Sequence, residues 1–330
     1  MKIGLKTLVL PAGEAAVAAA ARALGQGGLV AFPTETVYGL GADATNAAAI
    51  ARLYQAKGRP AFNPLIAHVG ELAAAMRIAR FDAPAMELAK AFWPGPLTLV
   101  LPKTDTCVVA DLATAGLDTV AIRIPAHPVA RDILRAFGRP VVAPSANLSG
   151  HVSPTIAAHV QGDLEGRIDL IVDGGAVAVG VESTIVGIFD APMLLRPGGL
   201  PRADIERVLG HALVQPPADA DSDSGQPLAP GMLASHYAPR TKVRLNADRI
   251  EPGEALLAFG LGAISGIDEA AAVLNLSAQG DLDEAAANLF GFLRALDTRA
   301  ARAIAVMPIP EDGLGEAIND RLRRAAVGRE

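Results

Sequence analysis

Segments typical of helices and of short buried strands alternate along most of this 330-residue chain. Alanine-rich helical patterns cover residues 12–24 and 84–92, and apolar runs typical of strands cover residues 29–32, 64–69 and 140–145. Such a chain folds as an α/β protein, because helices must cover the apolar faces of the sheet. Regular strand–helix–strand units are few, so the sequence predicts a twisted mixed sheet with surrounding helices.

The chain is long enough for two domains, and its composition changes after the first two hundred residues. The change begins with a stretch rich in proline, aspartate, serine and glycine, which is typical of a linker. Met232, His236 and Tyr237 follow it and make the segment less like a passive spacer. We therefore expect a larger domain at residues 1–211, a linker or lid at 212–240 and a smaller Rossmann-like α/β domain at 241–330.

Several classes of protein are excluded by composition. Hydrophobic residues make up 51% of the chain, yet they form no uncharged apolar run of about 18 residues, which a membrane helix needs. The N-terminus has no apolar signal-peptide core before Pro11. The single cysteine, Cys107, excludes an intrachain disulfide, and six scattered histidines without an HExxH motif predict no metal site built from protein ligands. We expect a cytoplasmic protein.

The formal net charge of −6 argues against direct nucleic-acid binding, because proteins that follow a phosphate backbone usually present a basic surface. A small anion in a local basic pocket remains compatible with this charge. Neither GxGxxG nor GxxxxGK[ST] occurs, so both standard nucleotide-binding fingerprints are missing from the sequence.

The KGRP loop carries two cations between a helical pattern and an apolar strand. Lys57 and Arg59 supply the charges, and Pro60 and Pro64 stiffen the connection, because proline restricts its own backbone and that of the preceding residue. A stiff loop with two cations is suited to hold an anion. The alternative interpretation is a solvated loop with two ordinary surface charges.

The segment FPTETVYGLG follows a strand and offers hydroxyl groups from Thr34 and Thr36. Gly39 and Gly41 would let the backbone approach a ligand closely. The alternative is a turn whose threonines cap a helix. A second loop, APSANLSG, has Ser145 and other small polar residues that could donate hydrogen bonds to an anion, although a serine-rich turn has the same composition.

Two arginines lie in or beside apolar strands. Arg123 would need a partner if it is buried, either a ligand carboxylate or an acidic side chain of this chain. Arg196 ends a strand just before a glycine-rich turn, which suits contact with phosphate or ribose. With Lys57 and Arg59 they make four candidate cations, and a pocket containing them suits ATP together with a small carboxylate. His68 lies within a strand pattern, where a core histidine is the simplest interpretation.

These segments together resemble a threonylcarbamoyl-AMP synthase of the YrdC-like family in its longer, two-domain form. The matching motifs are PTETVYGLG, KGRP with NPLIAH, PGPLTLVL, PSANLSG followed by SPT, ESTI and RPG. PGMLASHYAP at 230–239 and GLGEAINDRLRRAA at 313–326 resemble the additional C-terminal region of the long form. The K-x-R and S-x-N signature is complete, whereas Asn63 stands where relatives often have histidine.

The resemblance implies an enzyme that forms L-threonylcarbamoyladenylate and pyrophosphate from L-threonine, bicarbonate and ATP, with Mg²⁺ accompanying ATP. A separate tRNA threonylcarbamoyltransferase complex would then transfer the threonylcarbamoyl group to an adenosine beside the anticodon. The fold would be the twisted mixed sheet of the family with a concave positive cavity.

The resemblance also implies roles for individual residues. Lys57 and Arg59 would be catalytic. The threonine site would contain Thr36, His68, Arg123, the backbone of Ala143 and Ser183. The ATP site would contain Arg59, Asn63, Thr119, Ser145, Asn147, Ser153 and Arg196, with Tyr237 reaching it from the linker.

Two other functions remain as alternatives. One is an RNA-binding module, since relatives have a basic concave face, although the negative net charge argues against it. The other is the carbamoyltransferase-type domain of a hydrogenase-maturation protein. That protein carries additional zinc-finger-like modules, which a chain with one cysteine cannot contain.

Overall fold

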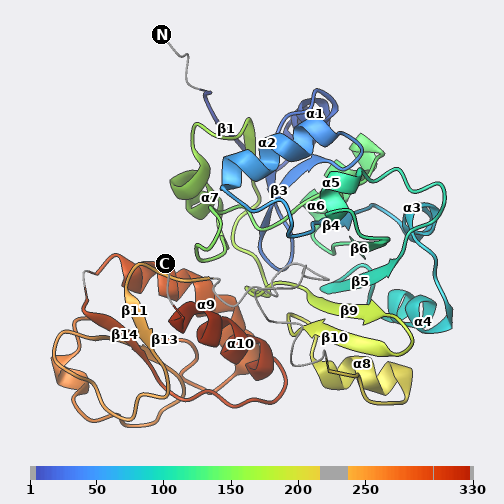
Figure 1. The fold of residues 1–330 in the computed structure, drawn as a ribbon. Coiled ribbons are helices and arrows are strands. Elements are labelled where there is room, and N and C mark those ends of the chain that lie inside the picture. Colours follow the sequence, from blue (N-terminus) through green and yellow to red (C-terminus); the bar gives the residue numbers. More distant parts are fainter. Residues whose placement is uncertain (1–4, 216–236, 300, 328–330) are drawn as a thin grey trace.

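The computed structural model describes residues 5–215, 237–299 and 301–327. Within this part, the chain forms a ten-stranded and a four-stranded sheet, which lie in two adjacent lobes (Figure 1). In the same residues no helix is long and apolar enough to cross a membrane. The predicted linker falls mostly on residues 216–236, which lie outside the described residues, as do Met232 and His236.

The larger sheet has the strand order β1-β8-β2-β3-β7-β4-β6-β5-β9-β10 and mixes parallel with antiparallel pairs, which confirms the predicted fold class. Its strands are β1 (Leu8–Pro11), β2 (Val30–Pro33), β3 (Tyr38–Asp43), β4 (Ile66–His68), β5 (Leu97–Pro102), β6 (Thr119–Arg123), β7 (Val141–Val142), β8 (Leu170–Asp173), β9 (Thr184–Ile188) and β10 (Pro192–Arg196). The helices of this lobe are α1 (Glu14–Gly25), α2 (Ala47–Lys57), α3 (Leu72–Ile78), α4 (Ala83–Phe92), α5 (Asp111–Thr114), α6 (Pro128–Phe137), α7 (Ala157–Leu164) and α8 (Arg202–Leu209).

Local sequence signals explain where the site-bearing loops begin. The Asn46 side chain caps α2 by accepting hydrogen bonds from two backbone N–H groups, as such residues do at helix N-termini. Gly58 ends the helix in the left-handed conformation, with φ of 61°. The KGRP loop therefore starts at a defined helix end, and Arg59 is held just beyond it.

Two strands differ from the sequence-based expectation. The FPTETVYGLG segment was expected to be a loop, yet β3 begins at Tyr38 and pairs antiparallel with β2, because the buried Tyr38 side chain packs in the core. The strand expected at 140–145 is only two residues long as β7. Pro140 and Pro144 flank it and lack the N–H that a longer ladder would need.

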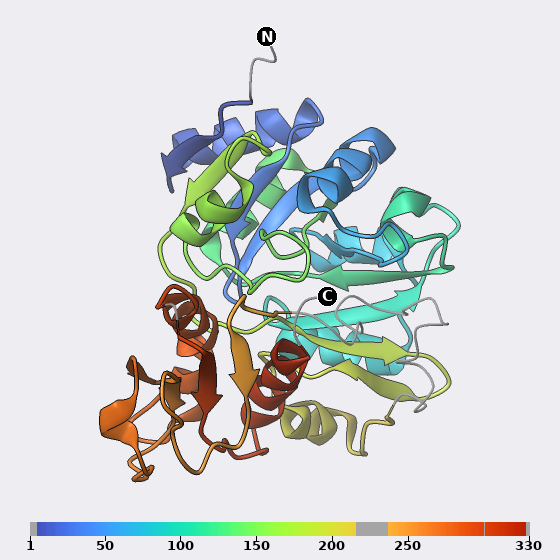
Figure 2. The ribbon, with the colours of Figure 1, turned by 60° about the vertical axis from the view of Figure 1, so that its left-hand side comes forward.

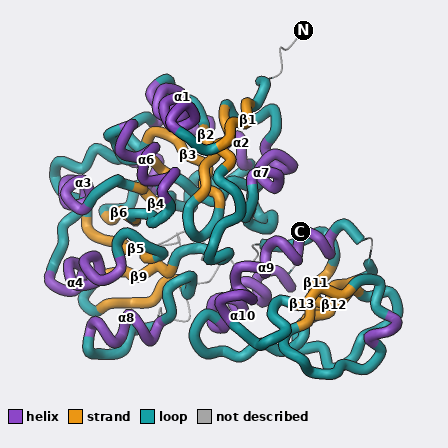
Figure 3. The backbone as a smooth tube through the Cα atoms, turned by 180° about the vertical axis from the view of Figure 1, so that it is seen from behind, coloured by secondary structure: helices purple, strands orange, loops and turns teal. Residues whose placement is uncertain are grey.

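The smaller sheet has the order β11-β14-β12-β13 and only parallel pairs among the described strands. Helices α9 and α10 pack between this sheet and the first lobe (Figure 3). The other face is covered by irregular segments that contribute Ile250 and Ile264. The elements are β11 (Lys242–Arg244), β12 (Ala255–Ala258), the 3-10 helix η2 (Ile267–Glu269), β13 (Val273–Asn275), α9 (Leu282–Asp297), β14 (Ala303–Val306) and α10 (Gly315–Ala326).

The two lobes share an interface with apolar and charged contacts. Val37, Val152 and Val181 of the first lobe belong to the same buried apolar cluster as the inner side chains of α9 and α10. Arg294 of α9 forms an ion pair with Asp163 at 2.8 Å. This shared core makes the smaller lobe a packed part of the molecule.

Gly180 of the first lobe lies very close to the backbone of α9 in the smaller lobe. It has a φ of +79°, and an added Cβ would lie 2.3 Å from the carbonyl oxygen of Ala286 in α9. Gly175 has a similar φ of +82° but nothing within 4 Å of a Cβ. A substitution at Gly175 would therefore introduce backbone strain alone, whereas a substitution at Gly180 would introduce the same strain and crowding at the interface.

We predict that Gly175→Ala lowers the free energy of unfolding by about 1 kcal/mol, because alanine is strained at positive φ. Gly180→Ala should lower it by about 2–4 kcal/mol, since overpacking against α9 adds to the same strain. Denaturant unfolding measures both changes. Hydrogen exchange in α9 should increase only in Gly180→Ala, and equal effects of the two variants would contradict a tight interface at this point.

Candidate active site

The larger sheet lies beside the smaller lobe (Figure 2). Residues at several strand ends of this sheet, together with Tyr237, line a small polar pocket. It encloses about 50 Å³. Three arginines and one carboxylate line it, together with a histidine, hydroxyl groups and backbone of small residues. The lining residues are Thr34, Thr36, Val37, Gly39, Arg59, Ile66, His68, Arg123, Ala143, Pro144, Ser145, Glu182, Ser183, Arg196 and Tyr237.

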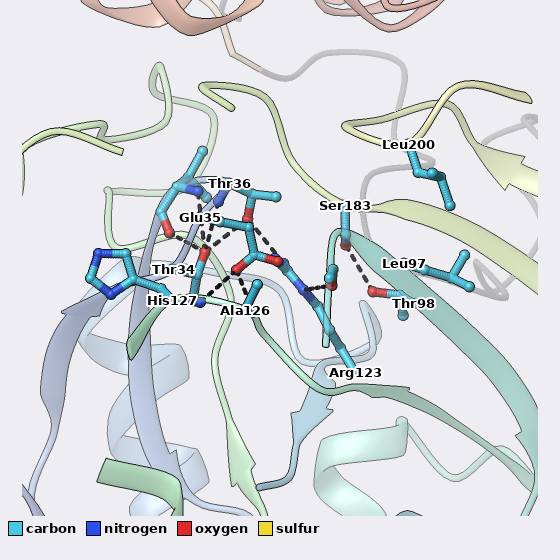
Figure 4. Close-up of polar contacts among 12 residues, drawn as sticks. Thr34, Glu35, Thr36, Leu97, Thr98, Arg123, Ala126, His127, Ser183 and Leu200 are labelled. Carbon is cyan, nitrogen blue, oxygen red and sulfur yellow. Dashed lines mark hydrogen bonds and ion pairs between the residues drawn. The ribbon is translucent and has the colours of Figure 1, made fainter. Parts of the chain in front are cut away.

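Arg123, at the end of β6, is buried and held by three different partners (Figure 4). Its Nη2 donates to Glu35 Oε1 at 2.7 Å, its Nη1 donates to Thr36 Oγ1 at 2.9 Å, and its Nε donates to the Gly95 carbonyl at 3.2 Å. Burial would raise the pKa of Glu35, but the charge of Arg123 and hydrogen bonds lower it. The acidic-partner alternative for Arg123 is thus realised in the structure, and its guanidinium still faces the pocket.

His68 ends β4 and is almost fully buried in the pocket wall. Burial and the nearby Arg123 charge lower its pKa to about 3, so the imidazole is neutral at physiological pH. Its Nδ1 lies 3.1 Å from the Ile66 carbonyl, which requires the proton on that nitrogen. A neutral imidazole can contact a bound amine or hydroxyl without adding charge.

The two cations of the KGRP loop occupy different positions. Arg59 lines the pocket and donates to the Pro64 carbonyl at 3.0 Å. Burial, opposed by Tyr54 and Tyr237 and reinforced by Arg196, lowers the pKa of Arg59 to about 10, so it stays charged. Lys57 is not among the residues that line the pocket.

Lys57 lies beneath the PSAN loop. Its Nζ donates to the carbonyls of Ser145 and Asn147, both at 2.5 Å. Burial lowers its pKa well below the ordinary value. This geometry places the ammonium where it orients the loop, whereas Ser145 itself reaches the pocket surface.

The ESTI and RPG motifs meet through backbone contacts. Arg196 Nη2 donates to the Ser183 carbonyl at 2.8 Å, and the Ser183 hydroxyl lies 2.8 Å from Thr98 Oγ1 (Figure 4). Gly198 passes so close that an added Cβ would lie 2.4 Å from backbone atoms of Glu182, Ser183 and Thr184. Gly198 is therefore required for the close approach of the RPG and ESTI backbones.

Nine of the predicted site residues line the pocket: Thr36, Arg59, His68, Arg123, Ala143, Ser145, Ser183, Arg196 and Tyr237. Five others lie off its described lining: Lys57, Asn63, Thr119, Asn147 and Ser153. Thr119 begins β6 and Arg123 ends it, which separates them by about 13 Å along an extended strand. Asn63 and Asn147 are buried behind the surface, and the Oδ1 atom of each has no hydrogen-bond partner among the described residues.

Two family models together match almost the whole chain. One, described as "Telomere recombination", matches residues 22–198, and the other, described as "Threonylcarbamoyl-AMP synthase, C-terminal domain", matches residues 200–327. The chain belongs to the threonylcarbamoyl-AMP synthase family. The predicted family, its long two-domain form and the enzyme class are confirmed.

Relatives and solved structures agree with this assignment. Threonylcarbamoyl-AMP synthase of Pyrococcus abyssi is 44% identical, covering 91% of both chains. That of Bacillus subtilis is 42% identical, covering 95% of this chain and 93% of the relative. The crystal structure of P. abyssi Sua5 complexed with L-threonine has a TM-score of 0.85 at 39% identity, covering 98% of this chain and 97% of that chain. The RNA-binding and carbamoyltransferase alternatives gain no support from these relatives.

A buried ion pair between the lobes was missed by the sequence analysis. Glu182 of the ESTI motif accepts from Arg321 Nε of α10 at 2.8 Å and from the Ser153 hydroxyl at 2.5 Å. The Arg321 guanidinium also lies 5.1 Å from the centre of the Tyr237 ring. Burial would raise the pKa of Glu182, but the charges of Arg321 and Arg196 lower it. The smaller lobe thus supplies a cation directly behind the pocket.

Helical spacing could have identified Arg321. It shares the buried face of α10 with Ile318, Leu322 and Ala325, where a charged residue is unusual. A charge in an apolar stripe predicts a buried partner. The position of that partner, more than a hundred residues earlier in the chain, could not be read from the pattern.

We predict that Arg321→Met lowers the free energy of unfolding by about 3–5 kcal/mol at neutral pH, because it leaves the Glu182 carboxylate buried and unpaired. Arg323→Met should have little effect, since the Arg323–Glu311 pair is exposed. Adding Glu182→Gln to Arg321→Met should restore part of the loss, as urea unfolding of the wild type and these three variants would measure.

The acid limb of the stability profile tests the same pair. The pKa of Glu182 is lowered in the folded state, so its ion pair stabilises the protein at neutral pH. That contribution is lost as the pH falls through the usual carboxyl range towards the lower folded pKa. The wild type should lose this stability on acidification and Arg321→Met should not. Parallel profiles would show that the pair contributes nothing.

Proposed function

We propose that this enzyme forms L-threonylcarbamoyladenylate and pyrophosphate from L-threonine, bicarbonate and ATP. The observation that carries the proposal is the convergence of Arg59, Arg123 and Arg196 with hydroxyl groups in one pocket. It is supported by the similarity to the P. abyssi protein complexed with L-threonine. The three cations would face the threonine carboxylate, the carbamate and the ATP phosphates, which are all negatively charged.

Threonine would bind on the side of the pocket formed by β4, β6 and the loop after β2. Its carboxylate would face the Arg123 guanidinium, and the neutral His68 and the Thr36 and Ser183 hydroxyls would orient its amine and hydroxyl. A site that hydrogen-bonds a substrate hydroxyl rejects analogues that lack it, so these groups would favour threonine over valine. The unprotonated amine attacks the carbon of CO₂ and loses a proton to solvent, which gives a carbamate. If bicarbonate reacts directly, a C–O bond breaks and that oxygen leaves as water.

ATP would lie against Arg59, Ser145 and Arg196. A carbamate oxygen attacks the α-phosphorus, and the bond from that phosphorus to the bridging oxygen breaks, so that pyrophosphate leaves with both electrons. No protein nucleophile is required. The arginines reduce repulsion between the two anions and stabilise the charge that develops in the transition state. Orientation of the two substrates would supply much of the remaining acceleration.

Magnesium would enter the site with ATP. The described residues contain no group of three histidine, cysteine, aspartate or glutamate side chains arranged to hold a metal ion. Glu35 and Glu182 are each engaged by arginine. The ion would therefore be held mainly by phosphate oxygens and water, as is usual for Mg²⁺ in ATP sites, and would neutralise phosphate charge.

Lys57, Asn147 and Ser153 would act indirectly. Lys57 and Asn147 fix the loop that presents Ser145, and Ser153 hydrogen-bonds Glu182 behind the pocket. Direct contact of Asn63 with ATP would need a local rearrangement, because its side chain is covered. Thr119 lies at the start of β6, away from the present pocket lining, and its contact with ATP stays a prediction.

Tyr237 would have to move before both substrates can bind. The enclosed space of about 50 Å³ is far below the roughly 300–1,000 Å³ of typical ligand sites. The Tyr237 ring lines it and stacks on Phe290 of α9, with ring centres 5.5 Å apart. We propose that the end of the 212–240 segment acts as a lid between domains at 1–211 and 241–330. The rest of the predicted 230–239 lid, up to residue 236, lies outside the described residues.

The product is a labile mixed anhydride, so a transferase must use it promptly. We propose that a tRNA threonylcarbamoyltransferase complex, in the cytoplasm, accepts the threonylcarbamoyl group. Direct RNA binding by this chain is not expected, and salt-insensitive, weak retention in a filter-binding series would agree with that.

Mass spectrometry of the products formed from ATP, Mg²⁺, threonine and bicarbonate tests the reaction directly. We predict that Arg59→Ala lowers the rate of pyrophosphate release about 30- to 1000-fold, because about 2–4 kcal/mol of transition-state stabilisation is lost. Arg80→Ala is the matched control, since Arg80 is an exposed arginine paired with Asp105. Equal rates in both variants would remove Arg59 from the catalytic role.

Arg123→Met should raise the KM for threonine at least about 10-fold and change the KM for ATP much less, because it removes a charge-assisted contact with the carboxylate. Glu35→Gln in the same background removes the carboxylate that would otherwise be left unpaired. If calorimetry finds wild-type threonine affinity in this double variant, Arg123 serves only to hold Glu35.

A further inference from the structure

A second and larger cavity is lined by residues of α3, α4 and α6 of the first lobe and by residues that follow β4 and β6. Its volume is about 700 Å³, which is within the roughly 300–1,000 Å³ of small-molecule sites. Among the described residues it shares no lining residue with the candidate active site. It is therefore a separate compartment.

The position of this cavity in the sheet favours a binding role. Strands β4 and β6 are parallel, and Val69 and Ile124, which follow them, line the cavity. Ligands in open α/β sheets commonly bind outside the carboxyl ends of parallel strands. His68 and Arg123, the preceding residues, line the active site instead, because consecutive residues of an extended chain point to opposite sides.

The lining combines an apolar wall with an excess of positive charge. The wall includes Leu72, Ile78, Trp93 and Leu134. Glu71 is the one acidic side chain of the described lining. The five basic side chains are Arg77, Lys90, Arg131, Arg135 and Arg139.

Four of these cations have structural explanations. Arg77, Lys90 and Arg135 lie in the last turns of α3, α4 and α6, where positive charge stabilises the helix dipole. Arg139 lies 3.1 Å from the buried carboxylate of Asp43. Arg131 lies in the first half of α6, where neither explanation applies.

Arg131 has a buried donor that nothing in the described part of the chain satisfies. Its Nε has no hydrogen-bond partner, and the guanidinium forms no ion pair with any described carboxylate. Burying an unpaired donor is unfavourable, and such groups in folded proteins usually have an acceptor. The Nε atom itself is covered, but Arg131 lines the cavity, so an anionic group there would accept hydrogen bonds from its terminal Nη groups and balance its charge.

We propose that this cavity binds a small organic anion, with its phosphate or carboxylate on Arg131 and a planar apolar body beside Trp93. The positive lining selects the charge, and the apolar wall favours an organic anion over an inorganic ion. This site does not depend on the proposed reaction, since it uses none of the active-site residues.

Trp93 is the only tryptophan of the chain, so its fluorescence reports on this cavity. The test titrates the full-length protein with phenyl phosphate and with benzoate, and uses phenol as the uncharged comparison. We expect a saturable change with at least one of the anions, and the stronger response distinguishes a phosphate site from a carboxylate site. Phenol should bind at least about 10-fold more weakly.

Two variants locate the binding. Arg131→Gln should weaken the anion about 10- to 100-fold, as expected for the loss of a charge-assisted hydrogen bond worth about 1.5–3 kcal/mol. Ala74→Phe should weaken binding of the anion as well, because the larger side chain fills the cavity from α3 without changing a charge. Arg22→Gln, which removes an exposed arginine on α1, should bind like the wild type.

Thermal unfolding of each variant shows whether it is folded. If Arg131→Gln does not fold, the binding measured with Ala74→Phe decides the test. The proposal is overturned if neither anion gives a saturable change in the wild type. It is also overturned if phenol binds as tightly as the anions, or if the folded variants at positions 131 and 74 bind like the wild type.

Discussion

The buried carboxylate of Glu182 joins the pocket to both lobes. It belongs to the first lobe, yet its principal cation, Arg321, comes from the last helix of the second. Removing either partner from a buried pair leaves an uncompensated group, which costs several kcal/mol. The hydrogen bond from Ser153 and the neighbouring position of Ser183 extend the influence of this pair to the pocket wall. The C-terminal lobe is therefore part of the site's architecture.

The end of the linker is fixed by the same interface. Tyr237 lies between Phe290 and Arg321, and the backbone N–H of Ala238 donates to the Gly150 carbonyl at 2.9 Å. A change in the docking of α9 and α10 would thus move Tyr237, and Tyr237 lines the pocket. The pocket and the interface are coupled because the Tyr237 ring belongs to both. The docking of the second lobe therefore helps to set the shape of the pocket wall.

Local patterns were sufficient for the fold class and for most long helices, because helix periodicity, caps and glycine turns act locally. Asn46 and Gly58, for example, define α2 by their own chemistry. Some of the nine pocket residues, such as His68 and Ala143, were expected only from the family resemblance. The patterns failed where the partner of a side chain comes from a distant segment of the chain. Lys57 looks like a ligand-binding cation, but the carbonyls that bind it lie about ninety residues away in the chain. Glu35 and Arg321 were missed because their partners are set by the sheet order and by lobe docking.

The partners of the cations explain how a pocket so rich in arginine stays suited to anions. Arg59 donates to backbone carbonyls and has no carboxylate partner among the described residues, and Arg196 donates to the carbonyl and hydroxyl of Ser183. Carbonyl oxygens satisfy the N–H donors of Arg59 without neutralising its charge, so the positive potential persists in a site of low dielectric constant. The charges of Arg123 and Arg196 are partly compensated by the nearby carboxylates of Glu35 and Glu182. Burial and the charge of Arg196 lower the pKa of Arg59, so an anion that binds between the two guanidinium groups would relieve the repulsion between them.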